Sequence, residues 1–110
     1  MTLFEKIIAR KIPADIVYED DRTIAFRDVN PQAPTHVLVV PKQVIPRLDT
    51  AGEGDVAVLG HCMLVAGKVA TQLGLGSYRV VINNGEDAGQ TVFHLHLHIL
   101  GGRKLGWPPG

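Results

Sequence analysis

The stretch His94-Leu95-His96-Leu97-His98-Ile99-Leu100 alternates imidazole and aliphatic side chains and ends in two aliphatic residues. Successive side chains of a β-strand point to opposite faces, so this spacing predicts a strand with three imidazoles in a row on one face. The intervening aliphatic side chains point the other way, where they can pack on a core that fixes the strand. Histidine titrates near neutral pH, so such a row can attack, donate protons or bind a metal.

Hydrophobic periodicity and turn-forming residues predict the remaining elements around this strand. Thr2 and Glu5 have the spacing of a capping box, which predicts a short first helix that ends by Pro13. A long second helix is predicted by an apolar stripe at helical spacing. The stripe consists of Val56, Leu59, Met63, Ala66, Val69, Ala70 and Leu73. The expected strands are residues 16–19, 23–28, 36–40, 78–83 and 91–100.

These elements predict the fold class. Short connections between consecutive strands favour antiparallel pairing, and two helices can cover only one face of such a sheet. We therefore expect an α+β domain with a five-stranded antiparallel sheet, both helices on one face and the histidines on the other. Residues 1–110 are expected to form a single domain, of which residues 101–110 are a C-terminal tail.

Composition narrows the class of protein. A chain of 110 residues can bury one core without a metal or a disulfide. Eleven basic and eleven acidic side chains leave no net charge, so no overall field favours nucleic acid or an anionic membrane. The apolar runs are much shorter than the ~20 residues of a membrane span. Cys62 is the only cysteine, which fits a reducing compartment. We expect a cytoplasmic protein without nucleic-acid or membrane partners.

The row of imidazoles has three interpretations. Two of them could bind zinc, with His36 or a carboxylate completing the ligand set. However, the Cα atoms of His94 and His98 would lie about 13–14 Å apart on an extended strand, near the limit for sharing one ion. Nucleophilic catalysis on phosphorus suits a linear array better, because one imidazole attacks while its neighbour holds the oxygens. In the third interpretation the histidines only line a sheet face and bind water.

The loop before the histidines adds a second indication. Its segments Asn83-Asn84-Gly85 and Gly89-Gln90-Thr91 can bring backbone N–H groups, amides and a hydroxyl to the start of the strand, as a phosphate cradle does. The same residue types are also common in ordinary hairpin loops. Elsewhere, the Asp28 carboxylate could accept bonds from a ribose. Apolar walls for a base could come from Phe4, Ile7, Phe26 and Val29.

Taken together, these residues resemble the histidine-triad family, in particular its branch of purine-nucleoside phosphoramidases often called Hint. The similarity runs from about Phe4 to Gly110 and is carried most specifically by residues 94–100. Supporting segments are Ala25–Asp28, Pro31–His36 and Trp107–Gly110.

The resemblance implies a homodimer whose two sheets join into one continuous ten-stranded sheet, with a purine nucleoside monophosphate held on each half. It implies that His96 attacks the α-phosphorus of a substrate such as adenosine 5′-phosphoramidate and expels the amine. Water then hydrolyses the resulting nucleotidyl-histidine. No cofactor is expected to be required, and a zinc ion, if bound, is not expected to be catalytic.

The resemblance also implies a role for each surrounding residue. His94 and His36 support and orient the nucleophile, and His98 holds phosphate oxygens. The nucleotide-binding residues implied in the same way are Asp28 at the ribose, Asn83, Gly89, Gln90 and Thr91 near the phosphate, and Phe4, Ile7, Phe26 and Val29 at the base. Two alternatives stay open, namely a dinucleoside polyphosphate hydrolase and a non-catalytic nucleotide-binding or scaffold protein.

Overall fold

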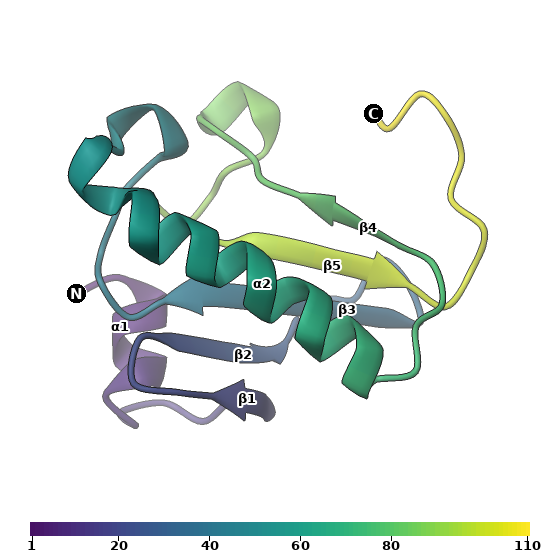
Figure 1. Cartoon of the computed structure of the whole chain (residues 1–110), viewed down its shortest axis with the longest axis horizontal. Helices are drawn as coiled ribbons and strands as arrows, with labels where there is room; N and C mark the ends of the chain where they lie inside the picture. The colour runs from purple at the N-terminus through teal and green to yellow at the C-terminus, as the bar shows by residue number, and fades with distance from the viewer.

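The computed structural model describes all 110 residues, which form two α-helices and five β-strands. The strands pair antiparallel in the order β1-β2-β3-β5-β4, so that β3 and β5 lie side by side near the centre of the sheet (Figure 1). The elements are α1 Leu3–Ile8, β1 Ile16–Glu19, β2 Thr23–Arg27, β3 Thr35–Pro41, α2 Val56–Gln72, β4 Tyr78–Val81 and β5 Leu97–Gly101. The predicted α+β class and the five-stranded antiparallel sheet are confirmed.

The larger core lies between the sheet and α2. Cys62, Val65 and Val69 of the helix are almost completely buried against aliphatic side chains of the central strands. Those strand residues are Val37, Val39, Leu97 and Ile99, with Leu95 just before β5. The aliphatic half of the histidine stretch therefore anchors the strand in this core, as the alternation predicts.

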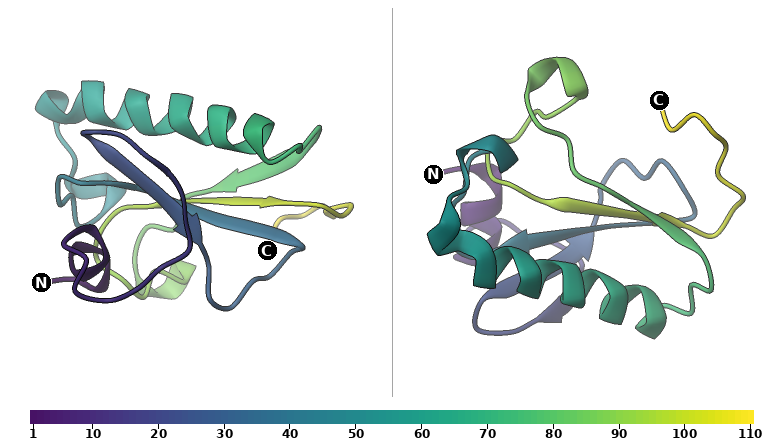
Figure 2. Two further views of the ribbon diagram at one scale, coloured as in Figure 1. Left: turned by 90° about the horizontal axis from the view of Figure 1, so that it is seen from below. Right: turned by 45° about the horizontal axis from the view of Figure 1, so that its top comes forward.

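The two helices lie on opposite faces of the sheet, so the expectation that both cover one face is wrong (Figure 2). Phe4 and Ile7 of α1 pack on the face that also carries the histidines. There they contact a second apolar cluster formed by Ile24, Phe26, Leu38 and Val40 of β2 and β3. Because β2 and β3 carry apolar side chains on both faces, the histidine face of these two strands also needs a cover, and α1 provides it.

The histidine segment is a strand only from Leu97 onward, rather than from residue 91. Pairing of β5 with β3 ends at Val39, and Leu95 instead donates its backbone N–H to the carbonyl of Ile45. β3 ends at Pro41, and the connection after it contains Pro46; neither residue has an N–H for a regular ladder. His94 and His96 thus lie before the strand, in an irregular segment that bends at residues 92–94.

The outer surface of α2 is more apolar than the sequence stripe predicts. Val56 and Met63, which belong to that stripe, are 67% and 55% exposed, and neighbouring Leu64 is 76% exposed. By length and hydropathy, residues 53–72 could cross a membrane, but the opposite side of this helix packs on the sheet as a core helix does. An apolar strip is therefore left uncovered in the single chain.

The C-terminal tail runs away from the end of β5 (Figure 1). The Arg79 guanidinium lies over the Trp107 ring and donates to the backbone carbonyl of Gly106. Trp107 itself is 82% exposed. The tail is thus fastened to β4 by one arginine while its indole faces solvent.

Candidate active site

The nucleophile assigned by resemblance, His96, has one of its two ring nitrogens fixed by the backbone. Its Nδ1 lies 2.7 Å from the carbonyl oxygen of His94. A carbonyl can only accept, so Nδ1 carries the proton and the lone pair of the neutral ring is on Nε2. The edge of the Phe4 ring and the ring of His98 flank the imidazole, with centroids 4.9 Å away in each case. This arrangement leaves Nε2 as a free nucleophilic nitrogen.

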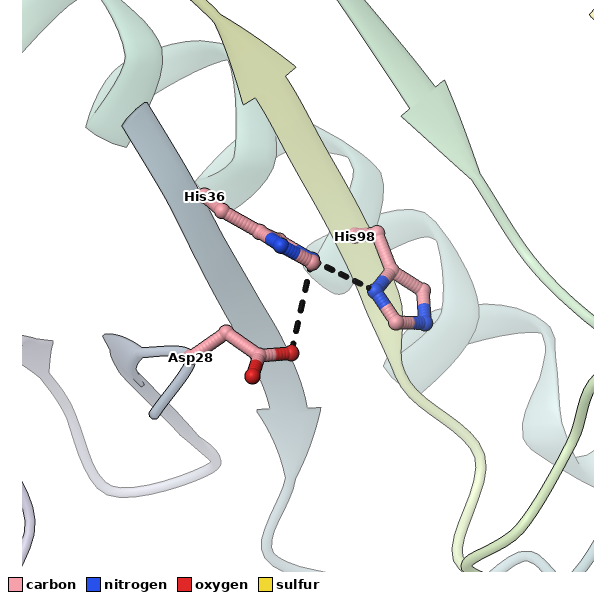
Figure 3. Close-up of side chains that lie close together, drawn as sticks. All are labelled: Asp28, His36 and His98. Carbon is pink, nitrogen blue, oxygen red and sulfur yellow. Dashed lines mark hydrogen bonds and ion pairs between the residues drawn. The ribbon is translucent and has the colours of Figure 1, made fainter. Parts of the chain in front are cut away.

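A chain of hydrogen bonds likewise fixes the proton of His98 (Figure 3). The backbone N–H of Gln32 donates to His36 Nδ1 at 3.0 Å, so the proton of neutral His36 is on Nε2. That Nε2–H donates to His98 Nδ1 at 2.9 Å, and Asp28 Oδ2 lies 3.4 Å from the same nitrogen. His98 must then carry its own proton on Nε2. His96 thus offers a lone pair on its Nε2, and His98 offers an N–H on its Nε2.

Burial keeps these imidazoles neutral. It is the main cause that lowers the pKa of His96 below the usual value, although the hydrogen bond to the His94 carbonyl opposes it. Burial, with the neighbouring His96 and His36, lowers the pKa of His98 to about 4. The pKa values of His36 and His94 are lowered mainly by burial as well. At neutral pH the site therefore holds neutral rings with defined tautomers.

These lowered pKa values predict that acid destabilises the fold before its carboxylates titrate. Below pH 6.5, about the pKa of histidine in the unfolded chain, the unfolded state binds protons that the buried histidines of the folded state do not bind. Folded stability is thus full above pH 6.5 and is lost as the pH falls toward the folded pKa of His98, about 4. We expect the free energy of unfolding from urea titrations to fall by on the order of 2 kcal/mol between pH 6.5 and pH 4.5. A constant value over that range would contradict the neutral assignment.

A cavity of about 220 Å³ opens beside the histidines between α1, β2 and the loop that precedes β5. Its wall combines the apolar side chains of Phe4, Ile7, Phe26 and Leu38 with the polar residues His96, His98 and Thr91. The predicted site residues that line it are Phe4, Ile7, Phe26, Asp28, Val29, Gly89, Thr91, His96 and His98. A pocket that offers both apolar and polar groups suits a ligand that joins a flat base to an anionic group.

Several lining residues were not anticipated from the sequence, including Leu3, Pro13, Arg27 and Val92. Leu38 could have been found, because it lies two residues from His36 on β3 and so shares its face. Leu3 and Arg27 lie at the ends of α1 and β2, and Pro13 and Val92 lie in loops, where periodicity does not reveal which side chains reach a pocket.

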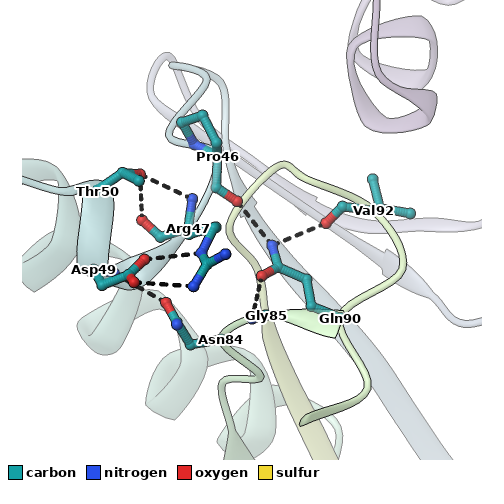
Figure 4. Close-up of polar contacts among 8 residues, drawn as sticks. All are labelled: Pro46, Arg47, Asp49, Thr50, Asn84, Gly85, Gln90 and Val92. Atoms are coloured by element: carbon teal, nitrogen blue, oxygen red, sulfur yellow. Dashed lines mark hydrogen bonds and ion pairs between the residues drawn. The ribbon is translucent and has the colours of Figure 1, made fainter. Parts of the chain in front are cut away.

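Gln90, predicted to bind the nucleotide, instead holds the loop together (Figure 4). Its buried side chain accepts from the Gly85 N–H and donates to the carbonyls of Pro46 and Val92. A hydrogen bond also joins the loop to the segment before α2, because the Asn84 side-chain oxygen accepts from the backbone N–H of Asp49. Gly85 and Gly89 adopt positive φ angles of 94° and 99°, which favour glycine.

Three further predicted residues, His94, Asn83 and His36, are not among the residues that line the cavity. His94 is completely buried, and its Nε2 donates to the Pro41 carbonyl at 2.7 Å. Asn83 lies beside Gly89, where its amide is 3.6 Å from the position that a Cβ would occupy. His36 reaches the cavity only through its hydrogen bond to His98, which does line it. These residues can shape the site without touching a ligand.

Asp28, His36 and His98 each offer a possible metal-ligand atom, and these atoms lie within 4.8 Å of one another. The hydrogen bonds of His36 do not suit a metal, however. A metal-binding histidine normally donates its other ring N–H to an acceptor, whereas Nδ1 of His36 faces the Gln32 N–H donor. A metal on Nε2 would leave that ring without any proton. The cluster is close enough for a metal but is built as a hydrogen-bond chain.

Comparisons with known proteins agree with this geometry. The family model of the HIT domain matches residues 9–105. The chain is 63% identical over 110 residues to an uncharacterized HIT-like protein of Synechocystis sp., covering 99% of this chain and 96% of that protein. It is 51% identical over 112 residues to the 14 kDa zinc-binding protein of Zea mays, covering 99% and 88%. The crystal structure of a HIT family hydrolase from Legionella pneumophila superposes with a TM-score of 0.97 at 45% identity, over 100% of both chains. The chain belongs to the HIT domain family.

Proposed function

We propose that this protein is a hydrolase that cleaves the P–N bond of purine nucleoside 5′-phosphoramidates through a nucleotidyl intermediate on His96. The observation that carries this proposal is the free Nε2 of His96, which faces a cavity while Nδ1 is held by the His94 carbonyl. The similarity to a HIT family hydrolase over the whole chain supports the hydrolase class.

In the first step, the Nε2 lone pair of His96 attacks the α-phosphorus and a new P–N bond forms to the ring. The bond between phosphorus and the substrate amine breaks, and the amine leaves after taking up a proton. The Thr91 hydroxyl lines the cavity and is exposed, so it is placed to pass that proton from water. The His98 Nε2–H can donate to the phosphate oxygens where charge develops.

In the second step, water attacks the phosphorus of the intermediate, the bond to His96 breaks, and the proton that the water loses passes to solvent. The departing imidazole recovers its lone pair on Nε2, so the ring returns to its starting tautomer and AMP is released. The phosphorylated imidazole carries its remaining proton on Nδ1, where the His94 carbonyl stabilises the charge. One backbone acceptor thus serves both halves of the reaction.

Nucleotide recognition is assigned to the two kinds of group that line the cavity. Phe4 and Phe26 meet edge to face at 5.5 Å, and we assign them, with Val29, to the purine. Asp28 also lines the cavity, and we assign its carboxylate to the ribose hydroxyls. The neutral net charge of the chain and the local character of this pocket favour a small nucleotide over nucleic acid.

The function is tested by steady-state hydrolysis of three substrates, namely adenosine 5′-phosphoramidate, an AMP–lysine conjugate and a diadenosine polyphosphate. We expect the two P–N compounds to be cleaved with the higher kcat/KM. Faster cleavage of the polyphosphate would favour the alternative hydrolase. Tight AMP binding with no cleavage of any of the three would favour a scaffold protein.

Removal of metals is expected to leave activity unchanged. The tautomer of His36 opposes a metal on the Asp28–His36–His98 cluster, and no step above needs one. Metal content by elemental analysis and kcat in excess chelator are measured on one preparation. Loss of activity on chelation, restored by zinc, would contradict the metal-free mechanism. Inhibition by added zinc would be compatible with it, because a metal on His98 would block the phosphate donor.

We further propose that two copies pair through β4 and α2. β4 is the edge strand of the sheet, so its outer backbone groups have no strand partner. Val56, Met63 and Leu64 of α2 present an uncovered apolar strip that a second copy could bury. Joining at β4 would make the sheet continuous across the dimer.

Light scattering at micromolar concentration is expected to give twice the chain mass of 11.9 kDa. Leu64→Glu, which places a charge in the apolar strip, should shift the mass toward that of one chain. Lys11→Glu, at an exposed position between α1 and β1, the strand at the other edge of the sheet, serves as a charge-changing control. A wild-type monomer mass would refute this pairing.

A further inference from the structure

The N-cap residue of α1 forms a side-chain hydrogen bond with the histidine segment. Thr2 is the N-cap of this helix, and its side chain forms a capping box with Glu5. The same Thr2 Oγ1 lies 3.0 Å from Nδ1 of His94, a residue 92 positions away in the chain. A residue that begins a helix therefore also touches the residue whose carbonyl holds the nucleophile.

The direction of this hydrogen bond follows from its neighbours. His94 Nε2 faces the Pro41 carbonyl at 2.7 Å, so Nε2 carries the proton of the neutral ring and Nδ1 is an acceptor. Thr2 Oγ1 accepts the Glu5 N–H at 3.1 Å, which leaves its own proton free to be donated. The hydroxyl must therefore donate to His94 Nδ1, and both ring nitrogens of His94 are satisfied.

The hydrogen bond between Thr2 and His94 is separated from the His96 ring only by His94 itself. His94 is completely buried, so rotation of its ring would leave polar atoms unpaired and would disturb the adjoining backbone. The carbonyl of His94 in turn accepts from His96 Nδ1 at 2.7 Å. Thr2 does not line the nucleotide cavity. Besides capping the helix that carries Phe4, it reaches the nucleophile through His94.

We propose that Thr2 is a positioning residue for the nucleophile: its hydroxyl fixes the ring of His94, and the His94 carbonyl then fixes the orientation of His96. This inference rests on the proposed function for its catalytic consequence. It assigns to the capping residue a second task that helix initiation does not require, because any good N-cap could start the helix.

Four substitutions separate the two tasks of Thr2. Asparagine, aspartate and serine are about equally good N-caps. Serine and asparagine can also donate to His94 Nδ1, whereas an ionised aspartate cannot and alanine can do neither. The isosteric pair Thr2→Asn and Thr2→Asp therefore keeps the cap and changes only the donor. Thr71→Val, on the exposed end of α2, is the control for loss of a threonine hydroxyl elsewhere.

We expect kcat for adenosine 5′-phosphoramidate to fall about tenfold in Thr2→Asp and Thr2→Ala, and to stay within about twofold in Thr2→Ser and Thr2→Asn. KM should change little in all four, since the residue does not touch the ligand. Thermal unfolding shows whether each variant is folded. Equal kcat in Thr2→Asp and Thr2→Asn would overturn the proposal, because a residue that serves only as a cap gives that result.

Nitrogen-15 NMR of the histidine rings tests the same contact without any substrate. In the wild type, His94 should be protonated on Nε2 only and His96 on Nδ1 only. Thr2→Asp should protonate His94 Nδ1 and shift the His96 Nδ1 signal, whereas Thr2→Asn should not. A proton on Nδ1 of wild-type His94 would overturn the proposal. If the protein does not cleave phosphoramidates, the proposed function fails, and these ring signals still decide whether Thr2 positions His96.

Discussion

Replacement of His96 by asparagine is expected to lower kcat for AMP release from adenosine 5′-phosphoramidate by about 10⁴-fold or more. Asparagine keeps a polar side chain of similar reach near the His94 carbonyl but has no nucleophilic nitrogen. The covalent route is then closed, and only the slow direct attack of water remains. AMP release measured by chromatography over hours gives the rate.

The matched control is His61→Asn, which removes an imidazole from α2, where it pairs with Asp20 far from the cavity. Its kcat should equal that of the wild type. AMP affinity of His96→Asn, measured by calorimetry, should stay within about tenfold of the wild type, because the rest of the cavity is intact. Retention of even a tenth of the wild-type kcat in this variant would contradict the role of His96.

The second large effect is expected for His98→Asn, which should lower kcat by about 10²- to 10³-fold. The substitution removes the His98 Nε2–H, which we propose donates a hydrogen bond to the phosphate oxygens. It also takes away the acceptor of the His36 Nε2–H, which then keeps only Asp28 at 3.4 Å. A single-turnover experiment should show that the formation of the nucleotidyl intermediate, rather than substrate binding, is slowed.

His36→Gln separates the two consequences of losing His98. A glutamine amide can still donate toward His98 Nδ1, so the tautomer of His98 is preserved and the loss of rate should be smaller. If His36→Gln were slower than His98→Asn, the His98 Nε2–H could not be the group that stabilises the transition state.

Much of the site could be predicted from the sequence because it depends on the period of a strand. The alternation from His94 to His98 places the aliphatic residues in the core under α2 and the imidazoles on the other face. The capping box of Thr2 and Glu5 also forms as predicted, since both residues lie in one helical turn.

The errors concern contacts between residues that are distant in the sequence. The face covered by α1 is set by the apolar side chains that β2 and β3 place beside the histidines, and local periodicity does not reveal it. The uncovered strip on α2 has a related cause. Val56 and Met63 are apolar and fit the helical spacing of the predicted stripe. In the structure they are exposed, because the sheet buries the adjacent side of the helix.

The division of roles among the histidines was also beyond sequence reasoning. Equal spacing makes His94, His96 and His98 equivalent, and the resemblance alone assigned them different tasks. In the structure, the difference comes from their partners, which are the Pro41 carbonyl, the His94 carbonyl and the His36 ring. The contacts of Gln90 could not be predicted from the sequence either, because its side-chain amide forms hydrogen bonds with three backbone groups of the loop and its neighbours.

The covalent intermediate tests the central claim most directly. Protein mixed with excess adenosine 5′-phosphoramidate is quenched within milliseconds to seconds at neutral or alkaline pH, where a phosphorylated imidazole survives, and its intact mass and peptides are measured. The account predicts one added adenylate group per chain, located on His96 and absent in His96→Asn. AMP release with no adduct at any quench time, or an adduct on another residue, would contradict it.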